Sequence, residues 1–243
     1  MYTQVCGKQL HEAVEKAMLA LNEAHVVEGE NQDMADTLKE ISLVMDVEDV
    51  SNPTISKSMP TDLEGLVKYD LEFLEGVRDF EPNWEYTYHR LFAPYLDKCI
   101  AELSRENSTR RAVLPVCGPL SYGNTHPPCL QVMTFKVVDG KLQTTAFFRS
   151  NDGVKAFQMN CFAIIRLAHY ISEKTGIPVG GYSHIANSFH AYHADWETLE
   201  AYCRRFTKDR ECYFEYEDYL EAYDEFAESY RKSCAEREAL FKI

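Results

Sequence analysis

Residues 127–152 read PPCLQVMTFKVVDGKLQTTAFFRSND, and this stretch decides the fold. Two runs rich in apolar and β-branched residues flank Asp139-Gly140, and that dipeptide between strand-like runs is a strong hairpin signal. The outer ends of a hairpin lie side by side, so we expect Cys129 close to Arg149 and Ser150. A thiol beside a guanidinium and a hydroxyl suits nucleophilic attack on an anionic substrate, because the cation favours the thiolate.

Composition narrows the class of protein. The chain has 243 residues, is 45% hydrophobic and carries a formal net charge of −14, which argues against a nucleic-acid backbone as its main partner. It has no apolar run long enough to cross a membrane, and residues 1–18 lack signal-peptide features. Its eight cysteines show neither a C-x-x-C pair nor a zinc-type spacing, so we expect no metal site and a reduced, cytoplasmic location.

Apolar periodicity predicts the remaining elements. Helical patterns occur in segments 8–24, 62–75, 95–106, 157–175 and, in an acidic, Tyr-rich form, 212–243. Strand-like segments are 41–45, 112–117, the two hairpin runs and 178–182. Thr61 or Asp62 is the expected N-cap of the second helix, and Gly76 lies near its end. These elements predict one α/β (α+β) domain over residues 1–243, with a mixed, largely antiparallel sheet and packed helices.

Four motifs follow one another at fixed spacings: PCLQ at 128–131, FRSND at 148–152, Asn160 eleven residues after Arg149, and HAY at 190–192. As a set they resemble the thymidylate synthase superfamily, most closely its short archaeal and hydroxymethylase-like branches. The resemblance covers roughly residues 84–196. It implies a thymidylate-synthase-like domain in a homodimer with shared active sites.

The resemblance implies roles for the residues at the hairpin ends. Cys129 is the nucleophile that adds to carbon 6 of a pyrimidine nucleotide monophosphate. Arg149 and Ser150 bind the nucleotide phosphate, and Arg110 and Arg111 reach across the dimer to the phosphate of the partner's nucleotide. Read alone, such an Arg pair is an ordinary solvated pair before a strand.

Further roles follow from the same resemblance. Asn160 reads the base and favours uracil, although an amide can flip to serve cytosine. His190 and Tyr192 hydrogen-bond the deoxyribose 3′-hydroxyl. Asp152 binds the pterin ring of the folate, and it also suits a helix N-cap.

Two positions concern proton transfer at carbon 5. Tyr86 matches the family tyrosine near the reacting carbon, where water relays the proton. The family also places a Glu on its early helix. In this chain the local sequence YDLEFLEG, residues 69–76, leaves Asp70 and Glu72 as alternatives.

The chain departs from the family pattern at several places. No Arg precedes Arg78, Leu130 replaces the usual His, and an acidic helix replaces the expected closing tail. The leading hypothesis is a thymidylate synthase that uses 5,10-methylenetetrahydrofolate, or a tetrahydromethanopterin relative, to methylate dUMP. The alternative is a hydroxymethylase of dUMP, dCMP or CMP, in which water adds to the methylene and the folate is not oxidised. A third hypothesis is a non-catalytic nucleotide-binding protein with this fold.

Overall fold

The computed structural model describes residues 2–30, 35–59, 62–118, 121, 123–209 and 212–241. Its strands are β1 (Thr3–Gly7), β2 (Val26–Glu30), β3 (Ala35–Val47), β4 (Ile55–Ser56), β5 (Val113–Pro115), β6 (Leu130–Val138), β7 (Lys141–Asp152), β8 (Val179–Tyr192) and β9 (Tyr213–Phe214). Its helices are α1 (Leu10–Asn22), α2 (Leu63–Glu75), α3 (Tyr88–Arg105), α4 (Phe157–Thr175), α5 (Trp196–Lys208) and α6 (Tyr216–Phe241), with a 3₁₀ turn, η2 (His193–Asp195), before α5.

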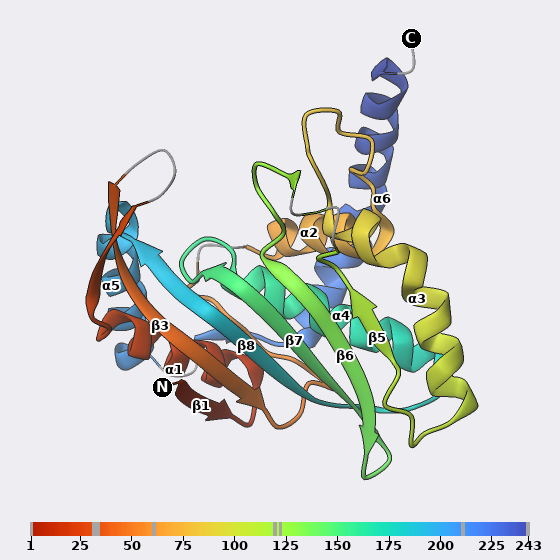
Figure 1. Ribbon diagram of the computed structural model, residues 1–243, viewed down its shortest axis with the longest axis horizontal. Coiled ribbons are helices and arrows are strands. Elements are labelled where there is room, and N and C mark those ends of the chain that lie inside the picture. The colour runs from red at the N-terminus through yellow and green to blue at the C-terminus, as the bar shows by residue number, and fades with distance from the viewer. Residues whose placement is uncertain are drawn as a thin grey trace.

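Seven strands form one mixed sheet in the order β1-β3-β8-β7-β6-β5, with β2 paired to β3 off this path. The pairs β2–β3, β3–β8, β5–β6 and β6–β7 are antiparallel, while β1–β3 and β7–β8 are parallel. Helices α1 and α4 lie behind this sheet in Figure 1, and α3 lies beside its β5 edge. The predicted α/β fold with a mixed, largely antiparallel sheet is confirmed.

The predicted hairpin forms from β6 and β7. Val138 pairs with Lys141 across the two-residue turn. Asp139 and Gly140 both have positive φ angles, 50° and 77°, as a type I′ hairpin turn requires. At the open end the Arg149 amide donates to the Cys129 carbonyl over 2.9 Å. The hairpin therefore brings the two ends together as its sequence predicts.

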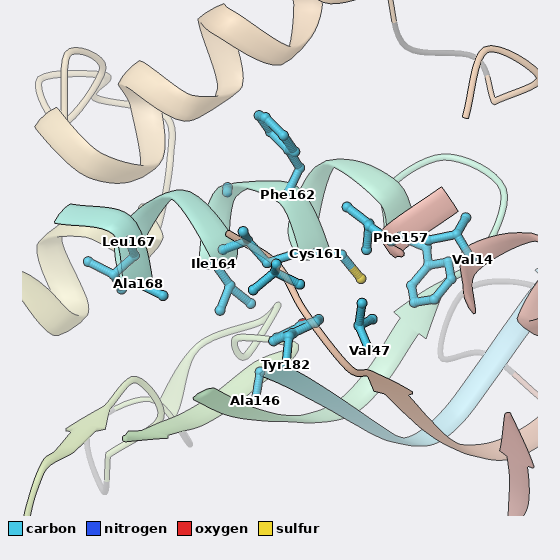
Figure 2. Close-up of a cluster of buried hydrophobic side chains, with 14 of the residues drawn as sticks. Val14, Val47, Ala146, Phe157, Cys161, Phe162, Ile164, Leu167, Ala168 and Tyr182 are labelled. Atoms are coloured by element: carbon cyan, nitrogen blue, oxygen red, sulfur yellow. The ribbon is translucent and has the colours of Figure 1, made fainter. Parts of the chain in front are cut away.

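Helix α4 forms the centre of the core. Figure 2 shows Cys161 and Ile164 pointing toward strand residues such as Tyr182, whereas Phe162 points away from the sheet. Phe162 instead meets Tyr219 of α6, with ring centroids 4.6 Å apart. Burying each large apolar side chain of this kind contributes about 1.5–3 kcal/mol. Helix α4 is thus packed between the sheet on one side and α2 and α6 on the other.

Local signals fix the ends of α2. Asp62 caps its first turn by accepting from the Gly65 amide over 2.7 Å, and Gly76 ends it with a φ of 64°, which favours glycine. The alternative cap, Thr61, lies outside the described residues.

Three predicted boundaries are wrong. Helix α3 begins at Tyr88, before Pro94, because the Thr87 side chain caps it and Phe92 is buried. Strand β3 extends well beyond 41–45, and β8 continues from 179 to 192. In both strands long ladders with neighbouring strands extend the pairing past the apolar core of the segment.

The C-terminal segment forms the long helix α6, as predicted, which packs against α2 and continues beyond it in Figure 1. None of the helices that the structure describes combines the length and the apolar character needed to cross a membrane.

Candidate active site

A pocket of about 250 Å³ opens between α2 and the segment that leads into α3. Helix α2 contributes Tyr69, Glu72 and Phe73, which share one helical face because they stand three and four residues apart. The other wall is the aromatic run that contains Trp84 and Tyr86, continued by Thr87 and Tyr88. The pocket is therefore mainly aromatic, with one carboxylate in its wall.

Cys129 lies at the base of β6, half-buried and within reach of Arg149. The Arg149 Nη2 atom is 3.8 Å from the Cys129 Sγ atom. The guanidinium is fixed by donating to the carbonyls of Pro127 over 2.7 Å and Pro128 over 3.0 Å. The predicted meeting of thiol and guanidinium is confirmed. Within the described residues, no hydrogen bond joins the Ser150 hydroxyl to the sulfur.

The electrostatics of the thiol differ from the sequence-based expectation. Burial raises the pKa of Cys129 above the ordinary thiol value, and the positive charge of Arg149 offsets only part of this rise. The negative charge of Asp152 raises the pKa further. The expectation of a low pKa considered the guanidinium alone, whereas desolvation of the thiolate has the larger effect here.

Tyrosines connect the pocket to the thiol. The Tyr88 hydroxyl accepts from the Leu130 amide over 3.4 Å, next to Cys129, and the rings of Tyr86 and Tyr88 lie 5.8 Å apart. Burial and the nearby Cys129 raise the pKa of Tyr86 to about 12. Tyr86 therefore stays protonated at neutral pH and can donate a hydrogen bond toward the sulfur side of the pocket.

Asn160 reaches the same pocket through one hydrogen bond. It is buried near the start of α4, and its Oδ1 atom accepts from the Tyr69 hydroxyl over 2.5 Å. This hydrogen bond ties the Asn160 amide to Tyr69, which lines the pocket. Sequence reasoning missed Tyr69 and Tyr88, although Tyr69 belongs to the same helical face as Glu72.

The two carboxylates left open by the sequence lie in different surroundings. Glu72 lines the pocket and accepts from the Tyr230 hydroxyl over 2.6 Å. Asp70 is 1% exposed and is ion-paired with Arg166 over 3.2 Å. Burial raises the pKa of Asp70 to about 6, although Arg166 opposes the rise. Of these two carboxylates, Glu72 is the one that lines the pocket.

Asp152, His190 and Tyr192 gather at the same end of the sheet as Arg149. Asp152 is the register partner of His190, and the rings of His190 and Tyr192 lie 4.9 Å apart. Burial lowers the pKa of His190, so its imidazole is neutral at pH 7. One Asp152 oxygen accepts from the amides of Val154 and Lys155, each over 2.9 Å. The carboxylate therefore caps the turn before α4.

Arg110 and Arg111 lie far from Cys129 in this chain. Both are exposed, and the adjacent Ala112 carbonyl accepts from the Phe135 amide near the middle of β6. At about 3.3 Å per strand residue this places them roughly 20 Å from the thiol. Within one chain the structure does not bring this pair to the site.

The sequence was compared with protein families and with curated proteins. The sequence model of the family described as thymidylate synthase matches residues 78–226, more than half of the chain. The chain belongs to the thymidylate synthase family. It is 30% identical over 203 residues to a protein of Methanocaldococcus jannaschii, and the alignment covers 75% of this chain and 87% of that protein. It is 27% identical over 167 residues to a protein of Methanosarcina barkeri, covering 66% and 76% of the two chains. Both relatives carry the provisional description thymidylate synthase.

A comparison with solved structures supports the fold. The thermostable thymidylate synthase A of Bacillus subtilis matches with a TM-score of 0.65 at 16% identity, covering 83% of this chain and 84% of that one. Members of the thymidylate synthase family are transferases that act on a dUMP-like nucleotide with a folate co-substrate, so the chain is a transferase. Across the part of the chain that the structure describes, no group of three or more His, Cys, Asp or Glu side chains is arranged to hold a metal ion.

Proposed function

We propose that this member of the thymidylate synthase family methylates dUMP with a one-carbon unit from 5,10-methylenetetrahydrofolate. The observation that carries the proposal is the Cys129 sulfur 3.8 Å from the Arg149 guanidinium, next to an aromatic pocket. A thiolate needs a cation beside it, and a nucleotide monophosphate needs a guanidinium for its phosphate. One Arg can serve both needs.

In the proposed reaction the Cys129 thiolate adds to carbon 6 of the pyrimidine. The new sulfur–carbon bond takes the electrons of the C5–C6 double bond onto carbon 5 and the C4 oxygen, which makes carbon 5 a nucleophile. When bound, the reduced folate supplies the one-carbon electrophile and, for a methyl product, the hydride. Carbon 5 bonds to this one-carbon unit, and loss of the carbon 5 proton breaks the bond from the unit to the folate nitrogen, which leaves an exocyclic methylene on carbon 5. Hydride addition to that methylene then drives departure of the thiolate from carbon 6 and restores the C5–C6 double bond.

Glu72 and Tyr86 are the proposed groups for proton transfer at carbon 5, acting through water in the pocket that both line. Asp70, the alternative to Glu72, is engaged by Arg166 and by the Tyr219 hydroxyl over 2.5 Å. It therefore has a structural role in this proposal. The raised thiol pKa means that a proton must leave Cys129 before addition, and Arg149 assists that loss.

The remaining residues are assigned to binding. Arg149 and Ser150 take the phosphate, and Asn160, held by the Tyr69 hydroxyl, reads the base. His190 and Tyr192 face the sugar hydroxyl from the neighbouring strand. The pterin ring suits the aromatic wall that contains Trp84, which is 38% exposed and therefore accessible. Asp152 would bind the polar edge of that ring.

The proposal includes a homodimer, because Arg110 and Arg111 are too far from Cys129 to serve their own chain. The sheet face opposite α4 carries half-buried side chains, among them Val132, Phe147 and Ile185. Strand side chains alternate between faces, so this set faces away from the helices and forms an apolar surface for a second subunit.

Hydroxymethyl transfer to the same nucleotide is the second candidate, and one observation favours it. No residue of α6 is among those that line the pocket in the described part of the chain. The C-terminal helix therefore does not exclude water from the reacting carbon, and water is the co-reactant that a hydroxymethylase requires.

Tritium release from carbon 5 of dUMP and dCMP tests the proposed chemistry. Wild-type protein with methylenetetrahydrofolate should release tritium from dUMP, and Cys129→Ser should release none while still binding the nucleotide. Formation of dihydrofolate, followed by absorbance, then separates methyl from hydroxymethyl transfer. Full activity of Cys129→Ser, or no release from either nucleotide, would refute the proposal.

A further inference from the structure

Helix α6 contacts α2 through a series of polar side chains. Tyr219 donates to Asp70, Tyr230 donates to Glu72, and Tyr223 donates to Glu75 over 2.5, 2.6 and 3.3 Å. Glu72 precedes and Tyr230 follows the segment 78–226 that matches the family model. Two regions outside the matched segment therefore meet at one wall of the pocket.

The contact to Glu72 differs from the others because its acceptor lines the pocket. Tyr230 and Arg78 both donate to the same oxygen, Oε1, over 2.6 and 3.4 Å. Among the described residues, no donor to the second oxygen, Oε2, is recorded. The two donors therefore orient the carboxylate and leave Oε2 available to water or ligand.

The two donors are themselves held in place. The Arg78 guanidinium lies 4.2 Å from the centre of the Trp84 ring and pairs with the buried Glu81 over 3.0 Å. Arg237 of α6 also forms an ion pair with Glu81, over 3.2 Å. The Tyr230 ring, on the other side, lies 5.7 Å from the Lys68 ammonium group of α2.

We propose that Tyr230 is a positioning residue, through which the C-terminal helix holds the Glu72 carboxylate in the geometry that proton transfer needs. The inference deepens the proposed function and rests on it. A glutamate side chain has three rotatable torsions, and a displacement of about 1 Å at a reacting group can cost about 100-fold in rate. Two fixed donors on one oxygen remove that freedom before substrate binds.

Tyr230→Phe removes only the hydroxyl. We expect its kcat for tritium release to fall about tenfold, part of that 100-fold, while its KM for the nucleotide changes less than twofold. The matched control is Tyr223→Phe, the same substitution seven residues earlier on α6, which loses hydrogen bonds to Glu75 and Arg231, neither of which lines the pocket. We expect wild-type kcat for the control.

A double-mutant cycle separates positioning from packing. Because Tyr230 acts through Glu72, adding Tyr230→Phe to Glu72→Gln should change kcat no further. Arg78→Lys, which disturbs the other donor to Oε1, should reproduce the kcat loss and serves as the second test if Tyr230→Phe does not fold.

Wild-type kcat in Tyr230→Phe, an equal loss in Tyr223→Phe, or additive losses in the cycle would each overturn the inference. Those results leave the proposed function intact as long as Cys129→Ser is inactive. Activity of Cys129→Ser would instead refute the proposed function itself.

Discussion

The pocket and the seam, which is the contact surface between α2 and α6, both contain carboxylates and tyrosines, but in different surroundings. In the pocket, Glu72 is 20% exposed and lines an aromatic cavity. In the seam, two residues earlier on the same helix, Asp70 is sealed between Arg166 and Tyr219. Residue type and spacing therefore do not assign a carboxylate to catalysis. The face of the helix on which it lies, and what covers that face, decide its role.

Glu72→Gln tests the pocket side of the comparison and has the largest expected effect. The amide cannot accept a proton as the carboxylate does, so tritium release should fall about 100-fold or more. The unfolding free energy should change by about 0.5 kcal/mol or less, because Gln can keep the contacts of Oε1. Urea unfolding and the release assay check the two halves. A large loss of stability with full activity would show that Glu72 stabilises the fold and is not needed for proton transfer.

Arg166→Met tests the seam, where Arg166 pairs with the buried Asp70. The folded pKa of Asp70, about 6, lies above its unfolded value, so the contribution of Asp70 to stability is fully present below about pH 4 and is lost as the pH rises through 6. Arg166 opposes the rise in pKa, and without it the buried carboxylate at pH 8 lacks its cation. We expect a loss of about 3 kcal/mol at pH 8.

The loss in Arg166→Met should be smaller at pH 5, because the wild-type carboxyl is already mostly protonated there. Urea unfolding at the two pH values measures the difference, and kcat of the folded variant should remain close to wild type. An equal loss at both pH values would show that Asp70 does not titrate with the pair.

The sequence was sufficient for the parts of the site that are local. The Asp139-Gly140 turn sets the register of the hairpin, and the hairpin places Cys129 against Arg149 without help from distant residues. The caps of α2, at Asp62 and Gly76, are local in the same sense. Their signals lie within a few residues of the structure they specify, which is why they could be predicted.

The choice between Asp70 and Glu72 needed contacts between distant segments. Tyr230 is 158 residues from Glu72 and Arg166 is 96 from Asp70, and no spacing within YDLEFLEG contains that information. The pKa of Cys129 failed to follow from sequence for the same reason. Its neighbours in the pocket, Tyr69 and Tyr88, come from two other parts of the chain.

Arg149→Leu tests how the guanidinium affects the pKa of the Cys129 thiol beside the pocket. Arg149 lowers the pKa of Cys129 while burial raises it, so removing the cation should move the thiol pKa still higher. Alkylation of Cys129 by iodoacetamide should then have its midpoint at higher pH than in wild type and be several-fold slower at pH 8. Running both proteins in a background with Cys6, Cys117 and Cys212 replaced by Ser removes the other accessible thiols. An unchanged midpoint would mean that Arg149 does not act on the sulfur.

Glu75→Gln has the smallest expected effect and tests whether the whole seam matters equally. Glu75 pairs with Arg231 over 2.6 Å, but both side chains are 39% exposed. Water and salt screen such a pair, so we expect a change of about 0.5 kcal/mol or less in unfolding free energy. Tritium release should be unchanged, because Glu75 lies about one turn further along α2 than Glu72 and does not line the pocket. If Glu75→Gln lost activity as Glu72→Gln does, contacts between α2 and α6 outside the pocket would also affect catalysis. The distinction between those contacts and the pocket would then fail. If only Glu72→Gln loses activity, the same helix pair supports two separable tasks, carried by glutamates three residues apart.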